Sequence, residues 1–361
     1  SANGISWTSR NSAVNNDWQS VTYGIVNGNG LFVAVANTGT GNRIMTSANG
    51  IDWTVRTPAA GNNWLGVTYG NGKFVAVSGN GSPKAMYSTN VIDWTLGTTN
   101  GVTSQQWVSV TYGNGLFVAV ARSGTSQVMT SSDGINWTLR SAPITNPWQS
   151  VTYGIVNGNG RFVAVANSGT GNRVMTSPDG LTWTARTSAA DVAWSGVTFG
   201  NNLWVAVASS GTTATDTGRV MTSSDGLTWT KRTAAAANQW RSVCYGNGLF
   251  VAVADSGTGN RVMTSTDGAG WTARVSASDN NWKAVTFTGG LFVAVAESGT
   301  GNRVMTSFDG LSWTSRTSAL DSPWSAVASG NRSVVAVSSA STTNAVMTSN
   351  SNADRAVAPV Q

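Results

Sequence analysis

The chain has 361 residues, a formal net charge of +6 and no histidine, so it lacks the most common general base and the most common metal ligand. Its one cysteine, Cys244, excludes an internal disulfide and a multi-cysteine metal site. Lysine and arginine are spread along the chain without a cluster, and no apolar run reaches the length of a membrane helix. We therefore expect no metal, no cofactor, no nucleic-acid partner and no membrane insertion.

The N-terminal residues are the end of a motif that is complete elsewhere in the chain. The opening stretch "SANGISWT" recurs as "SANGIDWT" at Ser47–Thr54. Between the two lie "WQSVTYG" at 18–24, the apolar run "LFVAVA" at 31–36 and "RIMTS" at 43–47, and "WTVRT" follows at 53–57. The short apolar or alternating runs, separated by Asn-Gly turns, predict four short strands over these ranges.

This four-strand unit repeats along the whole chain. One methionine marks each copy: Met45, Met86, Met129, Met175, Met221, Met263, Met305 and Met347. Eight tryptophans follow the turn before the fourth strand: Trp7, Trp53, Trp94, Trp137, Trp183, Trp229, Trp271 and Trp313. Eight more open the first strand of a copy: Trp18, Trp64, Trp107, Trp148, Trp194, Trp240, Trp282 and Trp324. A spacing of 41 to 46 residues is typical of four-stranded propeller blades.

The apolar second strand predicts how the copies stack. In the first copy, Phe32 and Ala34 point to one side of the strand, while Val33 and Val35 point to the other, so both faces are apolar. A strand that is apolar on both faces is buried on both faces. We expect the small alanine face of one blade to receive the larger valine face of the next.

The two ends of the chain predict how the ring closes. The last copy ends at Ser349 without a fourth strand, whereas residues 1–10 form a fourth strand that lacks the other three. Joining them completes an eighth blade and leaves no open array with exposed sheet edges. The sequence therefore predicts an all-β, eight-bladed β-propeller of four-stranded blades. It forms one domain, 1–349, in which residues 1–10 complete the last blade with 324–349, and residues 350–361 form a C-terminal tail.

The turns before the fourth strands resemble the Asp-box of sialidase-like (BNR-repeat) β-propellers. Five of them read "SSDGINW", "SPDGLTW", "SSDGLTW", "STDGAGW" and "SFDGLSW". The copies depart from the family in two ways: Asp and Gly adjoin, and Asn3, Asn49 and Asn90 replace Asp, with Val91 in the Gly position of one copy. In such a box the Asx side chain bonds the turn backbone and the Trp packs between sheets, so we expect these residues to be structural.

The chain is not expected to be an enzyme. The sialidase-like enzymes that it resembles use an arginine cluster that binds a carboxylate, a Tyr activated by Glu, and an Asp acid. Here the only glutamate, Glu297, lies at a loop position that holds Asn37, Arg122, Asn167 or Asp255 in other copies. Glycoside hydrolysis needs two carboxylates at a defined separation, and near-identical blades offer no asymmetric place for such a pair.

Multivalent ligand binding is the leading functional interpretation. In a propeller, the loops joining strands two to three and four to one share a face, and each copy brings a Trp, an Asn and usually an Arg to it. An aromatic plate beside amide and guanidinium donors suits sugars, and eight weak sites gain from avidity on a polyvalent surface. The similarity to propeller lectins likewise implies that the partners are glycans or glycoconjugates. The candidate ligand residues are Trp18, Trp64, Trp107, Trp148, Trp194, Trp240, Trp282, Trp324, Asn42, Arg43, Asn172, Arg173, Arg219, Asn260, Arg261, Asn302 and Arg303.

Other readings stay open. These tryptophans can be packing between blades, and these arginines can be capping nearby carbonyls. A second arginine ring follows the outer strand and is expected to face solvent or the adjacent blade: Arg10, Arg56, Arg140, Arg186, Arg232, Arg274 and Arg316. The alternative function is a structural or adhesive display module of a cell surface, appendage or viral fibre, and a sialidase-like glycosidase is a remote alternative. The leading and the alternative interpretation both place the protein outside the cell or on a surface.

Overall fold

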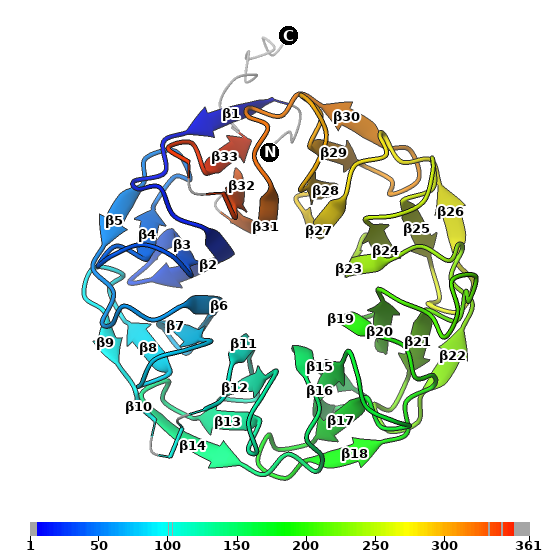
Figure 1. Cartoon of the computed structure of the whole chain (residues 1–361), viewed down its shortest axis with the longest axis horizontal. Coiled ribbons are helices and arrows are strands. Elements are labelled where there is room, and N and C mark those ends of the chain that lie inside the picture. Colours follow the sequence, from blue (N-terminus) through cyan, green and yellow to red (C-terminus); the bar gives the residue numbers. More distant parts are fainter. Residues whose placement is uncertain (1–5, 100, 103, 331–332, 341, 350–361) are drawn as a thin grey trace, which may run out of the picture.

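In the computed structural model the chain forms eight antiparallel sheets around a central axis, which confirms the eight-bladed β-propeller (Figure 1). The structure describes residues 6–99, 101–102, 104–330, 333–340 and 342–349. Within these residues every regular element is a strand, and no helix has the length and apolar character needed to cross a bilayer.

Each blade runs outward from the axis through four strands. The inner strands are β2 (Trp18–Val26), β6 (Trp64–Gly70), β11 (Trp107–Gly113), β15 (Trp148–Val156), β19 (Trp194–Gly200), β23 (Trp240–Gly246), β27 (Trp282–Thr288) and β31 (Trp324–Gly330). The second strands are β3 (Asn29–Ala36), β7 (Lys73–Ser78), β12 (Leu116–Ala121), β16 (Asn159–Ala166), β20 (Leu203–Ala208), β24 (Leu249–Ala254), β28 (Leu291–Ala296) and β32 (Ser333–Ser338).

The third strands are β4 (Ile44–Ser47), β8 (Ala85–Ser88), β13 (Val128–Ser131), β17 (Val174–Ser177), β21 (Val220–Ser223), β25 (Val262–Ser265), β29 (Val304–Ser307) and β33 (Val346–Ser349). The outer strands are β5 (Thr54–Arg56), β9 (Thr95–Leu96), β14 (Asn136–Arg140), β18 (Thr184–Arg186), β22 (Thr230–Arg232), β26 (Thr272–Arg274), β30 (Thr314–Arg316) and β1 (Trp7–Arg10). We number the blades 1 to 8 in this order, so that β2 to β5 form blade 1 and β31 to β33 form blade 8 with β1.

The ring closes through the N-terminal strand, as the sequence predicts. β1 pairs antiparallel with β33, from Trp7 opposite Ser349 to Arg10 opposite Val346. Just beyond β1, the Ser12 hydroxyl donates to the carbonyls of Thr342 and Thr343, at 3.1 and 3.0 Å. The expected tail, 350–361, and the box residue Asn3 lie outside the described residues.

The blades are held together by apolar faces of unequal size. Val33 and Val35 of blade 1 pack against Trp64 and Ala76 of blade 2, and all four side chains are fully buried. Each alanine face thus receives the valine face of the preceding blade, a direction opposite to the expected one. Full burial of a valine contributes about 1.5–3 kcal/mol, so eight such interfaces stabilise the ring.

Blade 3 differs from the expected four strands by one short addition. β10 (Thr98–Thr99) pairs in parallel with the start of β14, Thr98 opposite Asn136 and Thr99 opposite Trp137. Gly97 precedes it, at the position where other outer strands carry arginine. A Cβ at Gly97 would lie 2.8 Å from the carbonyl oxygen of Ile135, so the close approach of the two segments requires glycine.

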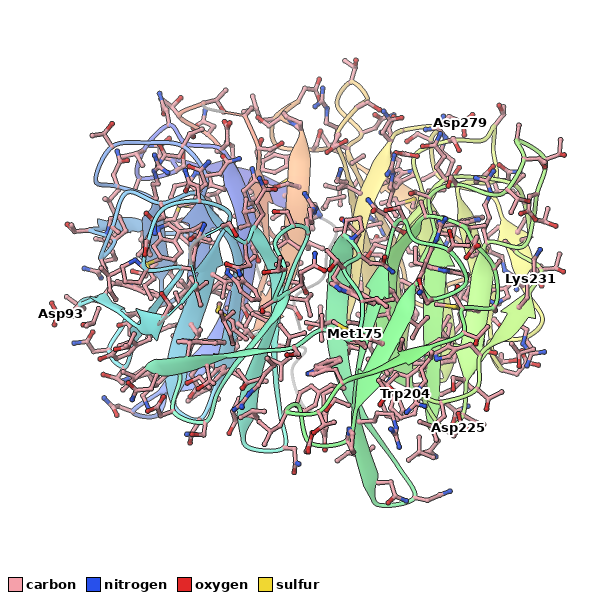
Figure 2. All side chains as sticks on the ribbon, turned by 60° about the horizontal axis from the view of Figure 1, so that its bottom comes forward. Asp93, Met175, Trp204, Asp225, Lys231 and Asp279 are labelled. Atoms are coloured by element: carbon pink, nitrogen blue, oxygen red, sulfur yellow. The ribbon has the colours of Figure 1, made fainter. Side chains whose placement is uncertain are left out.

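The connections fall on two opposite faces of the ring. Loops from the second to the third strand and from the outer strand to the next inner strand form one face, which we call the loop face. First-to-second hairpins and third-to-outer turns form the other, the turn face. In Figure 2, Asp279 lies in a loop after β26 and Asp225 lies in the turn between β21 and β22, toward opposite sides of the ring.

Candidate functional site

The tryptophans predicted to contact a ligand lie in the core, which corrects that part of the site prediction. The whole series is 0% exposed: Trp18, Trp64, Trp107, Trp148, Trp194, Trp240, Trp282 and Trp324. Each opens an inner strand and packs in the blade interface, as Trp18 does with Ala34 and Val337. With no ring surface accessible, the loop face has none of the predicted aromatic plates, and the packing alternative describes these residues.

The loop-face arginines bond to their own loops. The Arg43 Nε donates to the carbonyl of Gly39 at 2.8 Å, and its Nη1 donates to Asn63 Oδ1 at 2.7 Å. The Arg219 side chain is buried and donates to the carbonyls of Asp216 and Asn238, both at 2.9 Å. The same Nε-to-glycine-carbonyl bond is made by Arg173, Arg261 and Arg303. These arginines therefore cap carbonyls, as the alternative interpretation holds.

The loop-face asparagines are engaged by a second set of asparagines that sequence reasoning missed. The Nδ2 of Asn16 donates to the carbonyl of Asn42 at 2.8 Å. The same bond joins Asn146 to Asn172, Asn238 to Asn260, and Asn280 to Asn302. The available signal was an asparagine two residues before the first-strand tryptophan in five copies: Asn16, Asn62, Asn146, Asn238 and Asn280. The polar groups predicted to meet a ligand are therefore largely satisfied within the loops.

The box turns of the turn face are closed by their Asx side chain. The Oδ1 of Asp309 accepts from the amides of Leu311 and Ser312, at 2.8 and 2.9 Å, and from the Ser307 hydroxyl. The amide of Ser312, and then that of Leu311, hold the pKa of Asp309 below its ordinary value. Trp313 Nε1 donates to the carbonyl of Gly310 at 2.9 Å. This confirms the structural role that was expected for the box aspartates and their tryptophan.

The two described boxes that carry asparagine place a carboxylate on the outer wall. In blade 1 the Nδ2 of Asn49 donates to the Asp52 carboxylate at 2.9 Å, and in blade 2 Asn90 donates to Asp93 at the same distance. In blade 3 the two residue types are exchanged: the box residue is Asp133, and the Nδ2 of Asn136, three positions later, donates to its carboxylate at 2.8 Å. An aspartate in the box would repel a carboxylate three residues later, so the asparagines allow and orient these two acids.

Two open grooves lie on the outer wall where consecutive blades meet, and we call them the rim grooves. The 8/1 groove has a volume of about 380 Å³ and is lined by Ser9, Arg10, Asn11, Ile51, Asp52 and Trp53. The 1/2 groove has a volume of about 430 Å³ and is lined by Val55, Arg56, Thr57, Pro58, Ile92, Asp93 and Trp94. Figure 2 shows Asp93 on the outer wall, directed away from the ring.

The rim grooves share a guanidinium, a carboxylate and an indole at equivalent positions. In the described residues, no ion pair within 4.0 Å joins Arg10 to Asp52 or Arg56 to Asp93, so both charges remain available. At the junction of blades 2 and 3 the chain itself occupies the position of the groove, because β10 lies along β14. At the remaining blades the residue before the box tryptophan is uncharged: Ser6, Thr182, Thr228, Gly270 and Ser312.

The arginines of the two rim grooves differ in their bonding. The Nε of Arg56 donates to Thr46 Oγ1 at 2.9 Å, as the outer-ring arginines of blades 3 to 7 also do with their third strand. The equivalent hydroxyl in blade 8, that of Thr348, bonds the carbonyl of Gly50 instead. The Nε of Arg10 is consequently buried without a partner among the described residues, which is costly for a charged donor.

Cys244 and the acidic residues give no sign of a reactive or metal-binding centre. Cys244 lies on β23, and burial raises the pKa of its thiol to about 12, which keeps it protonated at neutral pH. Over the described ranges, no group of three or more His, Cys, Asp or Glu side chains gathers as a metal site would require.

Comparison with known proteins identifies the fold alone. No family model matches the chain, and no curated protein matches it in sequence. The computationally designed Ika8 protein has a TM-score of 0.70 at 14% identity, over 95% of this chain and 99% of its own. For Sqt1 of Saccharomyces cerevisiae the TM-score is 0.66 at 9% identity, over 94% and 98%. YCF48 bound to a D1 peptide gives 0.55 at 14% identity, over 80% and 91%.

Proposed function

We propose that this propeller is a non-enzymatic, multivalent carbohydrate-binding module whose sugars lie in the rim grooves instead of on the loop face. The observation that carries the proposal is the recurrence of one constellation, guanidinium, oriented carboxylate and indole, in two consecutive grooves. The box turns that hold it are, in this proposal, Asp-boxes of the sialidase-like kind. A glycan ligand also implies an extracellular or surface-exposed location.

The chemistry of the rim grooves suits hydroxyl groups. The carboxylates of Asp52 and Asp93 accept hydrogen bonds, and the guanidiniums of Arg10 and Arg56 donate them, so neighbouring sugar hydroxyls find both kinds of partner. Trp53 is partly exposed beside them and offers an apolar ring edge to a sugar C–H face. Volumes of about 380 and 430 Å³ fall in the range of small-molecule sites.

The same residues argue against catalysis. Each rim groove is lined by one carboxylate, whereas glycoside hydrolysis by the common mechanism uses two across the scissile bond. Asp52 and Asp93 lie in different grooves, so they do not form such a pair. Binding without bond cleavage is therefore the function that this arrangement supports.

The test is glycan binding by the protein at high surface density, followed by calorimetry in solution with the best ligand. Asp52→Asn and Asp93→Asn each remove one charge-assisted acceptor without changing side-chain size. Such a bond contributes about 1.5–3 kcal/mol, so we expect each change to weaken its own groove roughly tenfold or more and the double variant to lose binding.

Asp309→Asn is the matched control, because it makes the same substitution in a box turn away from the rim grooves. It is expected to leave the affinity unchanged. Sugar binding that survives the double substitution, or that is weakened equally by Asp309→Asn, would show that the sugars do not lie in the rim grooves.

A second candidate function is a structural display module of a surface or fibre assembly. The observation in its favour is that the loop-face arginines and asparagines bond to one another and to loop carbonyls. A dense glycan screen separates the two functions, since a correctly folded ring that binds no glycan supports display.

A further inference from the structure

A separate pocket lies at the inner rim of the loop face, where inner strands begin and second strands end. Its volume is about 200 Å³, and its residues come from blades 3 to 7, an arc from β12 to β27 in Figure 1. It is lined by Arg122, Gln149, Asn167, Trp194, Ser195, Ser209, Arg241 and Lys283. We call it the inner-rim pocket.

Of the residues that the structure describes, three cationic side chains and no carboxylate line the inner-rim pocket. Two of the cations have acidic partners outside the lining: Arg241 pairs with Asp255, and Lys283 Nζ lies 3.0 Å from an oxygen of Glu297. Arg122 forms no ion pair within the part of the chain that the structure describes. The local excess of positive charge therefore belongs to Arg122, whose side chain is exposed.

This charge is confined to one arc of an otherwise repetitive ring. The second residue of the inner strand is, in chain order, Gln19, Leu65, Val108, Gln149, Ser195, Arg241, Lys283 and Ser325. The residue after the second strand is Asn37, Gly79, Arg122, Asn167, Ser209, Asp255, Glu297 and Ser339. Charged side chains at these two positions occur only in blades 3, 6 and 7.

The walls of the inner-rim pocket are fixed by hydrogen bonds. The Ser195 hydroxyl donates to the carbonyl of Trp240 in the next blade at 2.6 Å. The Arg122 amide donates to the Gln106 carbonyl at 2.8 Å, and its Nε donates to Gln149 Oε1 at 3.0 Å. These bonds orient the Arg122 guanidinium before any ligand arrives, which reduces the ordering cost of binding.

We propose that the inner-rim pocket binds a tetrahedral oxyanion, a sulfate or phosphate group carried by a larger ligand. Arg122, Arg241 and Lys283 approach the pocket from three different blades, and a tetrahedral group presents terminal oxygens in several directions at once. The guanidinium fork of Arg122 donates two parallel bonds to such oxygens, and the amides and hydroxyls of the lining donate further ones. This proposal does not rest on the rim grooves, which lie on the outer wall.

Calorimetry of the full chain with inorganic sulfate, inorganic phosphate and acetate, at constant ionic strength, tests the proposal. We expect saturable one-site binding of sulfate or phosphate and at least tenfold weaker binding of planar acetate. Glucose 6-sulfate and glucose 6-phosphate, compared with glucose, then decide which ester the pocket prefers. Arg122→Gln should weaken binding of the preferred anion at least tenfold. The affinity of Arg122→Lys should lie between those of Arg122→Gln and the parent chain.

Lys73→Gln is the control, because it removes the same charge at the start of β7, next to the turn face. It should not change anion affinity, and both variants should keep the melting temperature of the parent, since neither residue forms an ion pair with any residue that the structure describes. Three results overturn the proposal: no saturable binding, equal weakening by Arg122→Gln and Lys73→Gln, or acetate binding as tightly as the tetrahedral ions.

Discussion

The Asx side chains close the box turns by accepting hydrogen bonds from turn amides, which does not require a charge. Asn49 Oδ1 accepts from the amides of Ile51 and Asp52 at 2.8 and 2.9 Å, the distances at which Asp309 accepts from its own turn. The turn therefore forms with either residue. The charge of the box residue matters for the residue three positions later. That residue is an aspartate only in copies whose box residue is the neutral asparagine.

At the residue scale, the lowered pKa of Asp309 makes the fold acid-sensitive. Because its pKa in the folded state lies below the unfolded value near 3.9, the ionised carboxylate stabilises the fold above that pH, and this stabilisation is lost as pH falls through the folded-state pKa. Asp309→Asn should match the parent chain closely at pH 7 and lose less stability below about pH 4. Denaturant unfolding between pH 7 and pH 2 measures the effect, and parallel stability curves for the two proteins would contradict it.

Trp282 tests whether the first-strand tryptophans are packing residues. It is fully buried, and its Nε1 donates to the carbonyl of Ser278 at 3.1 Å. Trp282→Ala should lower the free energy of unfolding by about 3–5 kcal/mol, as large-to-small changes in a packed core do. Urea unfolding at pH 7 measures the loss. A destabilisation below 1 kcal/mol would mean that the indole is not packed as the structure shows.

At the scale of elements, the sequence predicts the strands and their burial on both faces better than it predicts the direction of stacking or the surface contacts. The period-2 and all-apolar runs locate the strands, because alternation and burial follow directly from strand geometry. Whether an indole at the start of a strand faces the core or the surface is a tertiary property, so the sequence favours packing for Trp18 but leaves ligand contact open. The Arg43 side chain donates to the Gly39 carbonyl, and the Asn42 carbonyl accepts from Asn16. The position of Asn16 two residues before Trp18 marks it as special, but that spacing does not say which group it contacts.

The added strand β10 was not foreseen, although the chain carries its signal. Gly97 stands where the other outer strands carry arginine, because a Cβ at this position would lie 2.8 Å from the carbonyl oxygen of Ile135. Gly97→Ala should cost about 1–3 kcal/mol, as overpacking does, and should speed hydrogen exchange at Thr98, whose amide donates to Ile135 at 2.8 Å. Gly270→Ala is the control, because its nearest contact would be 3.9 Å away, and it should change stability by about 0.5 kcal/mol at most. Equal effects of the two substitutions would contradict the assigned role of Gly97.

At the scale of the whole molecule, closure protects the edge of β33. A chain that begins at residue 11 loses the buried Trp7 and exposes that edge. Its free energy of unfolding should fall by at least the roughly 3–5 kcal/mol that loss of one core tryptophan costs, and its open edge should promote association that rises with concentration. Ultracentrifugation and thermal unfolding measure both effects, and a synthetic peptide of residues 1–10 should reverse them. A truncated chain that stays monomeric and as stable as the parent would show that the pairing of β1 with β33 is not needed for the fold.

The chain is a ring sealed by the pairing of β1 with β33, and backbone hydrogen exchange tests this closure most directly. Mass spectrometry of the native protein compares peptic fragments that cover residues 6–10 and 346–349. Both fragments are expected to exchange more slowly than an unstructured peptide, since both strands belong to one four-stranded sheet. Exchange of residues 6–10 at the rate of an unstructured peptide, with 346–349 still protected, would contradict the closed eight-bladed ring.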